Sequence, residues 1–138
     1  MVSPSTPGSG GSDTGYSADW RVRPAGAVVR VRGALDMRTA PELAGTLTDA
    51  SDAGTTEVYL DLRGLHVLGS AGLRVLITGH QGLSSAGRRL VVVATQLAVL
   101  RVLRVTGLDT VLTVRAELPE AELPQTGSTR RSPPPSED

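Results

Sequence analysis

The sequence contains no cysteine and no lysine, so its basic side chains are arginines apart from two histidines. Without cysteine, the chain has no disulfide framework, no cysteine-ligated zinc site and no thiol nucleophile. Without lysine, it lacks the phosphate-binding P-loop motif, which ends in Gly-Lys followed by Ser or Thr. One Trp and two Tyr are too few for an aromatic surface that stacks on nucleic-acid bases. These absences exclude thiol chemistry, P-loop nucleotide binding and base stacking.

An excess of one charge and long apolar runs are also missing. The 14 basic and 14 acidic residues cancel, which argues against a chain that coats nucleic acid or an anionic membrane. No window approaches the ~18 apolar residues of a membrane span, and the first residues lack the basic start and apolar run of a signal peptide. We therefore expect a soluble cytoplasmic protein with no membrane partner and no direct nucleic-acid partner. Residues 21–118 hold 12 Arg and 8 acidic residues, an excess that suits a negatively charged partner face.

Both ends of the chain differ in composition from the middle. Residues 1–19 consist mainly of Ser, Gly, Pro and Thr, and residues 119–138 hold five of the nine prolines. Such segments bury too little apolar surface to offset the entropy that ordering costs. We predict disordered tails over 1–19 and 119–138, the second of them proline-rich, and one folded domain over 20–118.

Several segments of the middle region have the patterns of β-strands. In "AVVRVRG" the valines alternate with arginines, as in a strand with one exposed face. The runs "EVYLDL" (57–62) and "RLVVVA" (89–94) are short and rich in apolar residues, which is typical of strands in a sheet that helices cover. A last short run, "TVLTV", is predicted to close the sheet.

Helical spacing alternates with these strands. The segment "TAPELAGTLTDAS" places Leu43, Leu47 and Ala50 on one side, with Thr39 as the N-cap and Pro41 in the first turn. A third helix is predicted within "TQLAVLRVLRVTGL", which ends in a C-cap glycine. Between them, a helix that begins near residue 71 has an apolar face made of Leu73, Leu76, Ile77, His80 and Leu83.

This alternation of strands and helices determines the predicted fold class. Strand, helix and strand in succession imply parallel strands joined by right-handed crossovers. We predict an α/β domain with a central, mostly parallel sheet of four to five strands and three to four helices.

Small residues surround Ser70 where the second helix begins. Gly69, Ala71 and Gly72 in "VLGSAGLRVL" leave the backbone of the first turn uncovered. We expect the Ser70 hydroxyl to cap the helix by accepting a hydrogen bond from the N–H of Gly72 or Leu73. The positive end of the helix dipole tolerates negative charge, so a phosphate on Ser70 would be accepted there and felt by a docked partner.

A catalytic role for Ser70 is disfavoured. A nucleophile elbow requires glycine two residues before the serine, where this sequence has Leu68. His80 belongs to the apolar face of its helix, and His66 has no acidic neighbour that the sequence assigns to it. We predict a protein that is not an enzyme, with no catalytic residues, no cofactor and no metal site.

The segment "LDLRGLHVLGSAGLRVL", preceded by "RGALDMRTAPEL" and followed by "GRRLVVVATQLAVLRVLRVTGLDTVLTV", resembles a STAS domain of the anti-sigma-factor antagonist type. The resemblance extends over about residues 20–118 and implies a STAS fold and a small binding module. In this family the unphosphorylated antagonist binds an anti-sigma factor, commonly a serine kinase, and so frees a sigma factor for transcription. The kinase phosphorylates the antagonist, which breaks the complex, and a phosphatase restores it.

By position, the resemblance makes Ser70 the phosphorylation site, places Asp36 near the same surface and implies a structural role for Asp61. With the small residues of the helix start, it predicts a partner-binding surface of Asp36, Gly69, Ser70, Ala71, Gly72 and Arg74. Arg74 suits either an acidic partner residue or the phosphate itself. The chain departs from the family at Gly69, where an Asp usually precedes the serine, and at Ala71, where a second hydroxyl is common. The alternative function is a STAS module that is never phosphorylated and that binds an anionic ligand or scaffolds a signalling complex.

Overall fold

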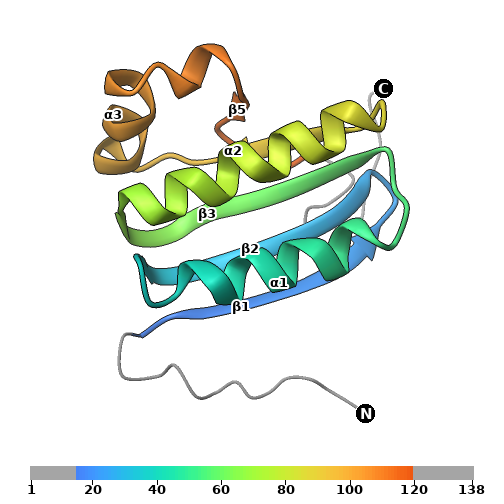
Figure 1. Ribbon diagram of the computed structural model, residues 1–138, viewed down its shortest axis with the longest axis horizontal. Helices are drawn as coiled ribbons and strands as arrows, with labels where there is room; N and C mark the ends of the chain where they lie inside the picture. Colours follow the sequence, from blue (N-terminus) through green and yellow to red (C-terminus); the bar gives the residue numbers. More distant parts are fainter. Residues whose placement is uncertain (1–14, 120–138) are drawn as a thin grey trace, which may run out of the picture.

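The computed structural model describes residues 15–119 of the 138 residues. Within this range the chain forms one five-stranded sheet and three α-helices (Figure 1). The strands are β1 (Ser17–Arg23), β2 (Gly26–Leu35), β3 (Glu57–Leu68), β4 (Arg89–Val93) and β5 (Thr113–Arg115). The helices are α1 (Ala40–Ser51), α2 (Ser70–Ser85) and α3 (Leu97–Val105), followed by the short 3₁₀ helix η2 (Leu108–Thr110).

The sheet has the order β1-β2-β3-β4-β5. Strand β1 runs antiparallel to β2, whereas each later strand is parallel to the one before it. The parallel pairs are joined by α1, α2 and α3, as the alternation of strand and helix patterns predicted. The predicted α/β class with a mostly parallel sheet is confirmed.

The three helices pack on one face of the sheet, and α1 and α2 lie side by side across it (Figure 1). The main core takes alternate residues from the strands and one buried stripe from each helix, including Val29, Leu60, Val92, Leu43, Leu76 and Leu103. The other strand residues face the opposite side, where Val28, Tyr59, Val91 and Val93 are buried together with Leu118. Because both faces bury apolar side chains, residues 90–93 of β4 form an unbroken apolar run rather than an alternating one.

Strand β1 was missed in the sequence, and the predicted domain boundary is wrong there. Ser17, Ala18 and Asp19 were assigned to the N-terminal tail, yet they pair with β2 in register, Ser17 with Arg32 and Asp19 with Arg30. Most β1 side chains are exposed because this is an edge strand, so no buried period appears in its sequence. Backbone pairing with β2 defines β1. The rest of the predicted tails, 1–14 and 120–138, lies outside the described residues.

Helix α2 approaches its neighbours closely because of two glycines. A Cβ atom on Gly72 would lie 2.8 Å from both Cγ and Cδ2 of Leu35 and 3.0 Å from Cδ1 of Leu68. A Cβ atom on Gly79 would lie 2.7 Å from Cδ2 of Leu47 in α1. The glycines therefore set the distance of α2 from the ends of β2 and β3 and from α1. Of the predicted apolar face of α2, Leu76 and Leu83 are buried and the other three residues are partly exposed.

Candidate functional site

The candidate site lies at the edge of the sheet where β2 and β3 end. These strands are parallel neighbours with Leu35 opposite Leu68, so the segments that follow them emerge side by side. The backbone N–H of Gly69 donates a hydrogen bond to the carbonyl oxygen of Leu35 at 2.9 Å. A Cβ atom on Gly69 would lie 3.8 Å from Cα of Asp36. Tertiary structure thus brings together Asp36 and Ser70, which are far apart in the sequence.

Ser70 is exposed and is the first residue of α2. The N-cap is Gly69, with extended backbone angles of φ −91° and ψ 176°, and no side chain caps the helix. The prediction that the Ser70 hydroxyl is the cap is therefore wrong. The helix begins one residue earlier than expected, because the Gly69 carbonyl oxygen already accepts the N–H of Leu73 at 3.1 Å. A hydroxyl inside the first turn is no longer in the N-cap position from which it reaches those N–H groups. Ser70 is left on the surface.

The loop between β2 and α1 is held by Asp36 and Thr39. Asp36 Oδ1 accepts hydrogen bonds from the backbone N–H groups of Arg38 at 2.9 Å and Thr39 at 3.2 Å. The buried Thr39 hydroxyl donates to the carbonyl oxygen of Ala34 at 2.8 Å and accepts the N–H of Asp36 at 2.9 Å. The hydrogen bond from Arg38 N–H, together with those from Thr39, lowers the pKa of Asp36 and keeps it ionised. The loop that carries this fixed negative charge passes beside Gly69, the residue before Ser70.

Thr39 occupies the predicted N-cap position of α1, and Pro41 lies in the first turn as expected. The Thr39 hydroxyl nevertheless makes no capping hydrogen bond to α1. It is engaged by β2 and by Asp36 instead. Thr39 thus orders the loop that carries Asp36, a role the capping pattern did not reveal.

A groove of about 760 Å³ runs between α1 and α2. Both helices begin at the same edge of the sheet, so Ser70 and Met37 lie at the end of the groove where the helices start. Small and apolar side chains predominate in its walls, which include Ala40, Pro41, Ala44, Leu47, Ala71, Val75, Gly79 and Leu83. Met37 is 80% exposed, and its apolar side chain extends this surface beyond the helices. The arrangement can accept apolar side chains of a binding partner next to a modifiable hydroxyl.

The structure brings most of the predicted surface together. Ser70, Ala71 and Arg74 line the groove, and Gly69 and Asp36 adjoin them at its end. Gly72 is an exception, since it is buried against Leu35 and cannot touch a docked partner. Its contribution is the close packing of α2. Sequence reasoning missed the groove itself, because residues of α1 and α2 form it jointly and neither helix shows it alone.

Comparison with known proteins agrees with this geometry. The sequence profile of the family described as "Mlab, STAS domain" matches residues 20–115. The chain belongs to the STAS domain family. The anti-sigma-B factor antagonist of Staphylococcus aureus is 29% identical to this STAS domain over 86 residues, which span 62% of the chain and 80% of that relative.

Solved structures of STAS proteins share its architecture. An anti-sigma factor antagonist from Mycobacterium paratuberculosis superposes with a TM-score of 0.71 at 27% identity, covering 78% of this chain and 91% of that one. The Bacillus cell fate determinant SpoIIAA, in its phosphorylated form, has the same fold, with a TM-score of 0.56 at 16% identity over 74% of this chain and 92% of its own. The resemblance to anti-sigma factor antagonists seen in the sequence is confirmed at the level of family and fold.

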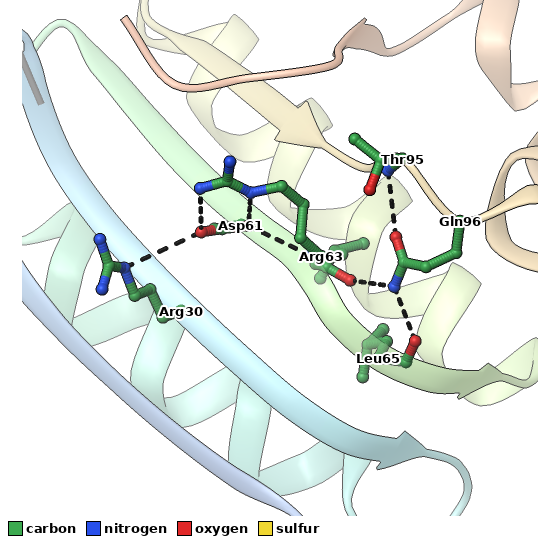
Figure 2. A network of polar contacts seen from close by, with 7 residues as sticks. Arg30, Asp61, Arg63, Leu65, Thr95 and Gln96 are labelled. Carbon is green, nitrogen blue, oxygen red and sulfur yellow. Dashed lines mark hydrogen bonds and ion pairs between the residues drawn. The ribbon is translucent and has the colours of Figure 1, made fainter. Parts of the chain in front are cut away.

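Asp61 of the STAS domain lies on the opposite face of the sheet from the helices (Figure 2). Its carboxylate accepts hydrogen bonds from Nε and Nη2 of Arg63, both at 2.9 Å, and Arg30 Nε lies 3.8 Å away. Burial of Asp61 favours a higher pKa, but the side-chain and backbone hydrogen bonds from Arg63 outweigh it, so the pKa is lowered. These contacts are consistent with the structural role expected for Asp61.

The same close-up shows how α3 is attached to the end of β3 (Figure 2). The Gln96 side-chain amide donates to the carbonyl oxygens of Leu62 at 2.7 Å and Leu65 at 2.6 Å. These carbonyls lie where the pairing of β2 with β3 shifts register. They also lie beyond the β3–β4 ladder, which ends at the Asp61–Val93 pair, so Gln96 supplies hydrogen-bond donors that β4 no longer provides.

Neither a metal centre nor a membrane span is found in the part of the chain that the structure describes. Over residues 15–119, no three His, Asp or Glu side chains are grouped so that they could hold a metal ion. None of the helices in this range combines the length and apolar character needed to cross a bilayer.

Proposed function

We propose that this STAS domain is an anti-sigma factor antagonist: it binds an anti-sigma factor, thereby releases a sigma factor, and is switched off by phosphorylation of Ser70. Relatives that carry the antagonist name support the family-level function. The observation that carries the proposal is the position of Ser70, exposed on the first turn of α2 beside the Asp36 loop and at the end of the α1–α2 groove. A modification of this hydroxyl changes the surface that a partner would cover. The work of the protein is then binding rather than catalysis.

The docking surface is proposed to be the α1–α2 groove together with the loop that carries Asp36. Apolar groove walls supply the buried contacts that dominate most protein interfaces. Arg74 lines the groove and Asp36 lies in the loop beside Gly69, so the two supply opposite charges that orient the partner. The anti-sigma factor would accordingly place apolar side chains in the groove and polar ones over Ser70.

Phosphorylation acts on this surface through charge. A phosphate adds about −1.5 to −2 charges at neutral pH, next to the ionised Asp36. A partner that fits a neutral Ser70 then meets two adjacent anionic groups or must desolvate them. A loss of about 3 kcal/mol of binding free energy weakens the affinity more than a hundredfold. One phosphate is therefore enough to switch the complex off.

Binding of variants to the cognate kinase-type anti-sigma factor tests this function. Isothermal titration calorimetry should show that Ser70→Ala binds like the unphosphorylated protein and that Ser70→Asp binds at least tenfold more weakly. Ser84→Asp is the matched control, since Ser84 is exposed in the last turn of α2 and does not line the groove. Equal affinities of Ser70→Asp and Ser70→Ala would contradict the proposal.

Phosphorylation itself is tested by incubation with the anti-sigma kinase and ATP, followed by mass spectrometry. We expect one phosphate on the peptide that contains Ser70, its loss in Ser70→Ala, and its removal by the phosphatase that acts on this system. The anti-sigma factor and the sigma factor that it releases control transcription, so the proposed location of the protein is the cytoplasm.

A second function is favoured by Gly69, which stands where the family usually has Asp. In this alternative the domain is never phosphorylated and instead binds an anionic ligand or scaffolds a signalling complex. The carboxylate that usually precedes the serine would then be dispensable. If no kinase adds a phosphate to Ser70 while an anionic ligand binds the wild-type domain, this second function replaces the first.

A further inference from the structure

Arg74 lies four residues after Ser70 in α2, one turn along the same side of the helix. Residues at this spacing have Cβ atoms about 5–6 Å apart, and helical side chains lean toward the N-terminus, so Arg74 leans toward Ser70. Both residues are exposed and both line the α1–α2 groove. The ion pairs found within residues 15–119 involve Arg30, Arg63 and Arg89, and none of them engages Arg74. The Arg74 guanidinium is thus available at the groove.

The start of α2 carries a positive charge that no side chain of its own first turn compensates. Its first turn contains no acidic residue, although anionic side chains stabilise helix N-termini. Arg74 adds a cation in the following turn, which opposes the helix dipole. Gly69, Ala71 and Gly72 bring no polar side chain that would compete for either group. A dianion on Ser70 would therefore lie at the positive end of the helix dipole and meet a guanidinium with donors in a fork.

We infer that a phosphate on Ser70 is bound by Arg74 of the same helix. The inference rests on the proposed function only in assuming that Ser70 becomes phosphorylated. The docking surface then changes in two ways: the phosphate adds negative charge, and the pairing makes Arg74 unavailable to an acidic partner residue. It stabilises α2 at the same time. The partner is then released by a change of surface charge while the helix stays folded.

Two other charged groups lie in the loop between β2 and α1, which passes beside Gly69. Asp36 is negatively charged, and its Oδ1 atom already accepts hydrogen bonds from two backbone N–H groups. It repels a phosphate and raises the second pKa of the phosphate. Arg38 is exposed in the same loop and is the rival cation. The helix spacing favours Arg74, and variants of each arginine separate the two.

The experiment uses the full chain with phosphoserine installed at position 70 during translation, so that no kinase is needed. Titration followed by ³¹P NMR gives the second pKa of the phosphate in the wild type, Arg74→Gln, Arg74→Lys and Arg38→Gln. We expect Arg74→Gln to raise this pKa by at least about 0.3 units, a twofold change in the ionisation constant that corresponds to about 0.4 kcal/mol. Arg74→Lys keeps the charge without the fork and should give a smaller rise. Arg38→Gln should leave the value unchanged.

The inference would be overturned if Arg74→Gln did not raise the second pKa of the phosphate, or if Arg38→Gln raised it more than Arg74→Gln does. Thermal unfolding gives a second readout: phosphate should raise the melting temperature of the wild type and raise that of Arg74→Gln less. Because Arg74 is exposed, the unphosphorylated variant is expected to keep the wild-type circular dichroism spectrum. The outcome is independent of the proposed function, which fails instead if the kinase does not modify Ser70 or if Ser70→Asp binds the anti-sigma factor as Ser70→Ala does.

Discussion

Replacing Gly72 by alanine should destabilise the domain and displace the start of α2. The added Cβ atom would lie 2.8 Å from Cγ and Cδ2 of Leu35, a side chain that is fully buried, and 3.0 Å from Leu68 Cδ1. Overpacking of this kind costs about 1–3 kcal/mol, whereas alanine gains about 1 kcal/mol over glycine inside a helix. We expect a net loss of about 1 kcal/mol. In a domain of this size that loss lowers the melting temperature by roughly 4–8 °C.

Gly82→Ala is the control within the same helix. No atom lies within 4 Å of a Cβ added at Gly82, so only the helix propensity changes. Stability should rise by about 1 kcal/mol, which makes the difference between the two variants about 2 kcal/mol. Urea denaturation followed by circular dichroism measures both. If Gly72→Ala proved as stable as Gly82→Ala, the close contact with Leu35 would not be what requires glycine.

The same substitution at Gly72 has a functional consequence. Ser70 is two residues away, and its position relative to Asp36 depends on how closely α2 approaches the end of β2. A shift of α2 moves Ser70 and one wall of the groove together. We expect Gly72→Ala to weaken binding of the anti-sigma factor in calorimetry. The control for binding is Gly45→Ala in α1, because a Cβ atom there meets no atom within 4 Å and Gly45 does not line the groove.

Three further outcomes are expected. Asp61→Asn should lower the free energy of unfolding by about 1–2 kcal/mol at pH 7, because charge-assisted hydrogen bonds become neutral ones. The pKa of Asp61 in the folded state is below 3.8, so the difference between the two proteins should fade as the pH falls through that pKa. Urea denaturation at several pH values measures it. Thr39→Val removes the partner of the part-buried Ala34 carbonyl and Asp36 N–H. It should cost about 1–3 kcal/mol and also weaken partner binding, as denaturation and calorimetry would show. Gly69→Ser, whose Cβ would have ordinary contacts, supplies a capping hydroxyl and should raise the melting temperature by a few degrees; a lower value would mean that the N-cap position requires glycine.

Much of the fold follows from local patterns. Apolar periodicity predicted the strands β2, β3 and β4 and the helices α1, α2 and α3, because burial on one or two faces leaves a period in the sequence. Strand β1 leaves no such period, since its side chains are mostly exposed and its backbone pairs with β2. The position of Ser70 relative to the helix start was misjudged by one residue, which turned a predicted cap into an exposed hydroxyl.

Local patterns in the sequence indicated the α/β class and a helix that begins within one residue of Ser70, and the motifs around Ser70 carried the resemblance to anti-sigma factor antagonists. Only the packed structure brought the Asp36 loop beside Gly69, buried Gly72 of α2 against Leu35 and opened the groove between α1 and α2. The physical reason is the range of the interactions. Helix and strand propensities act between residues a few positions apart, whereas the site is made by parallel pairing of β2 with β3, which joins segments more than thirty residues apart.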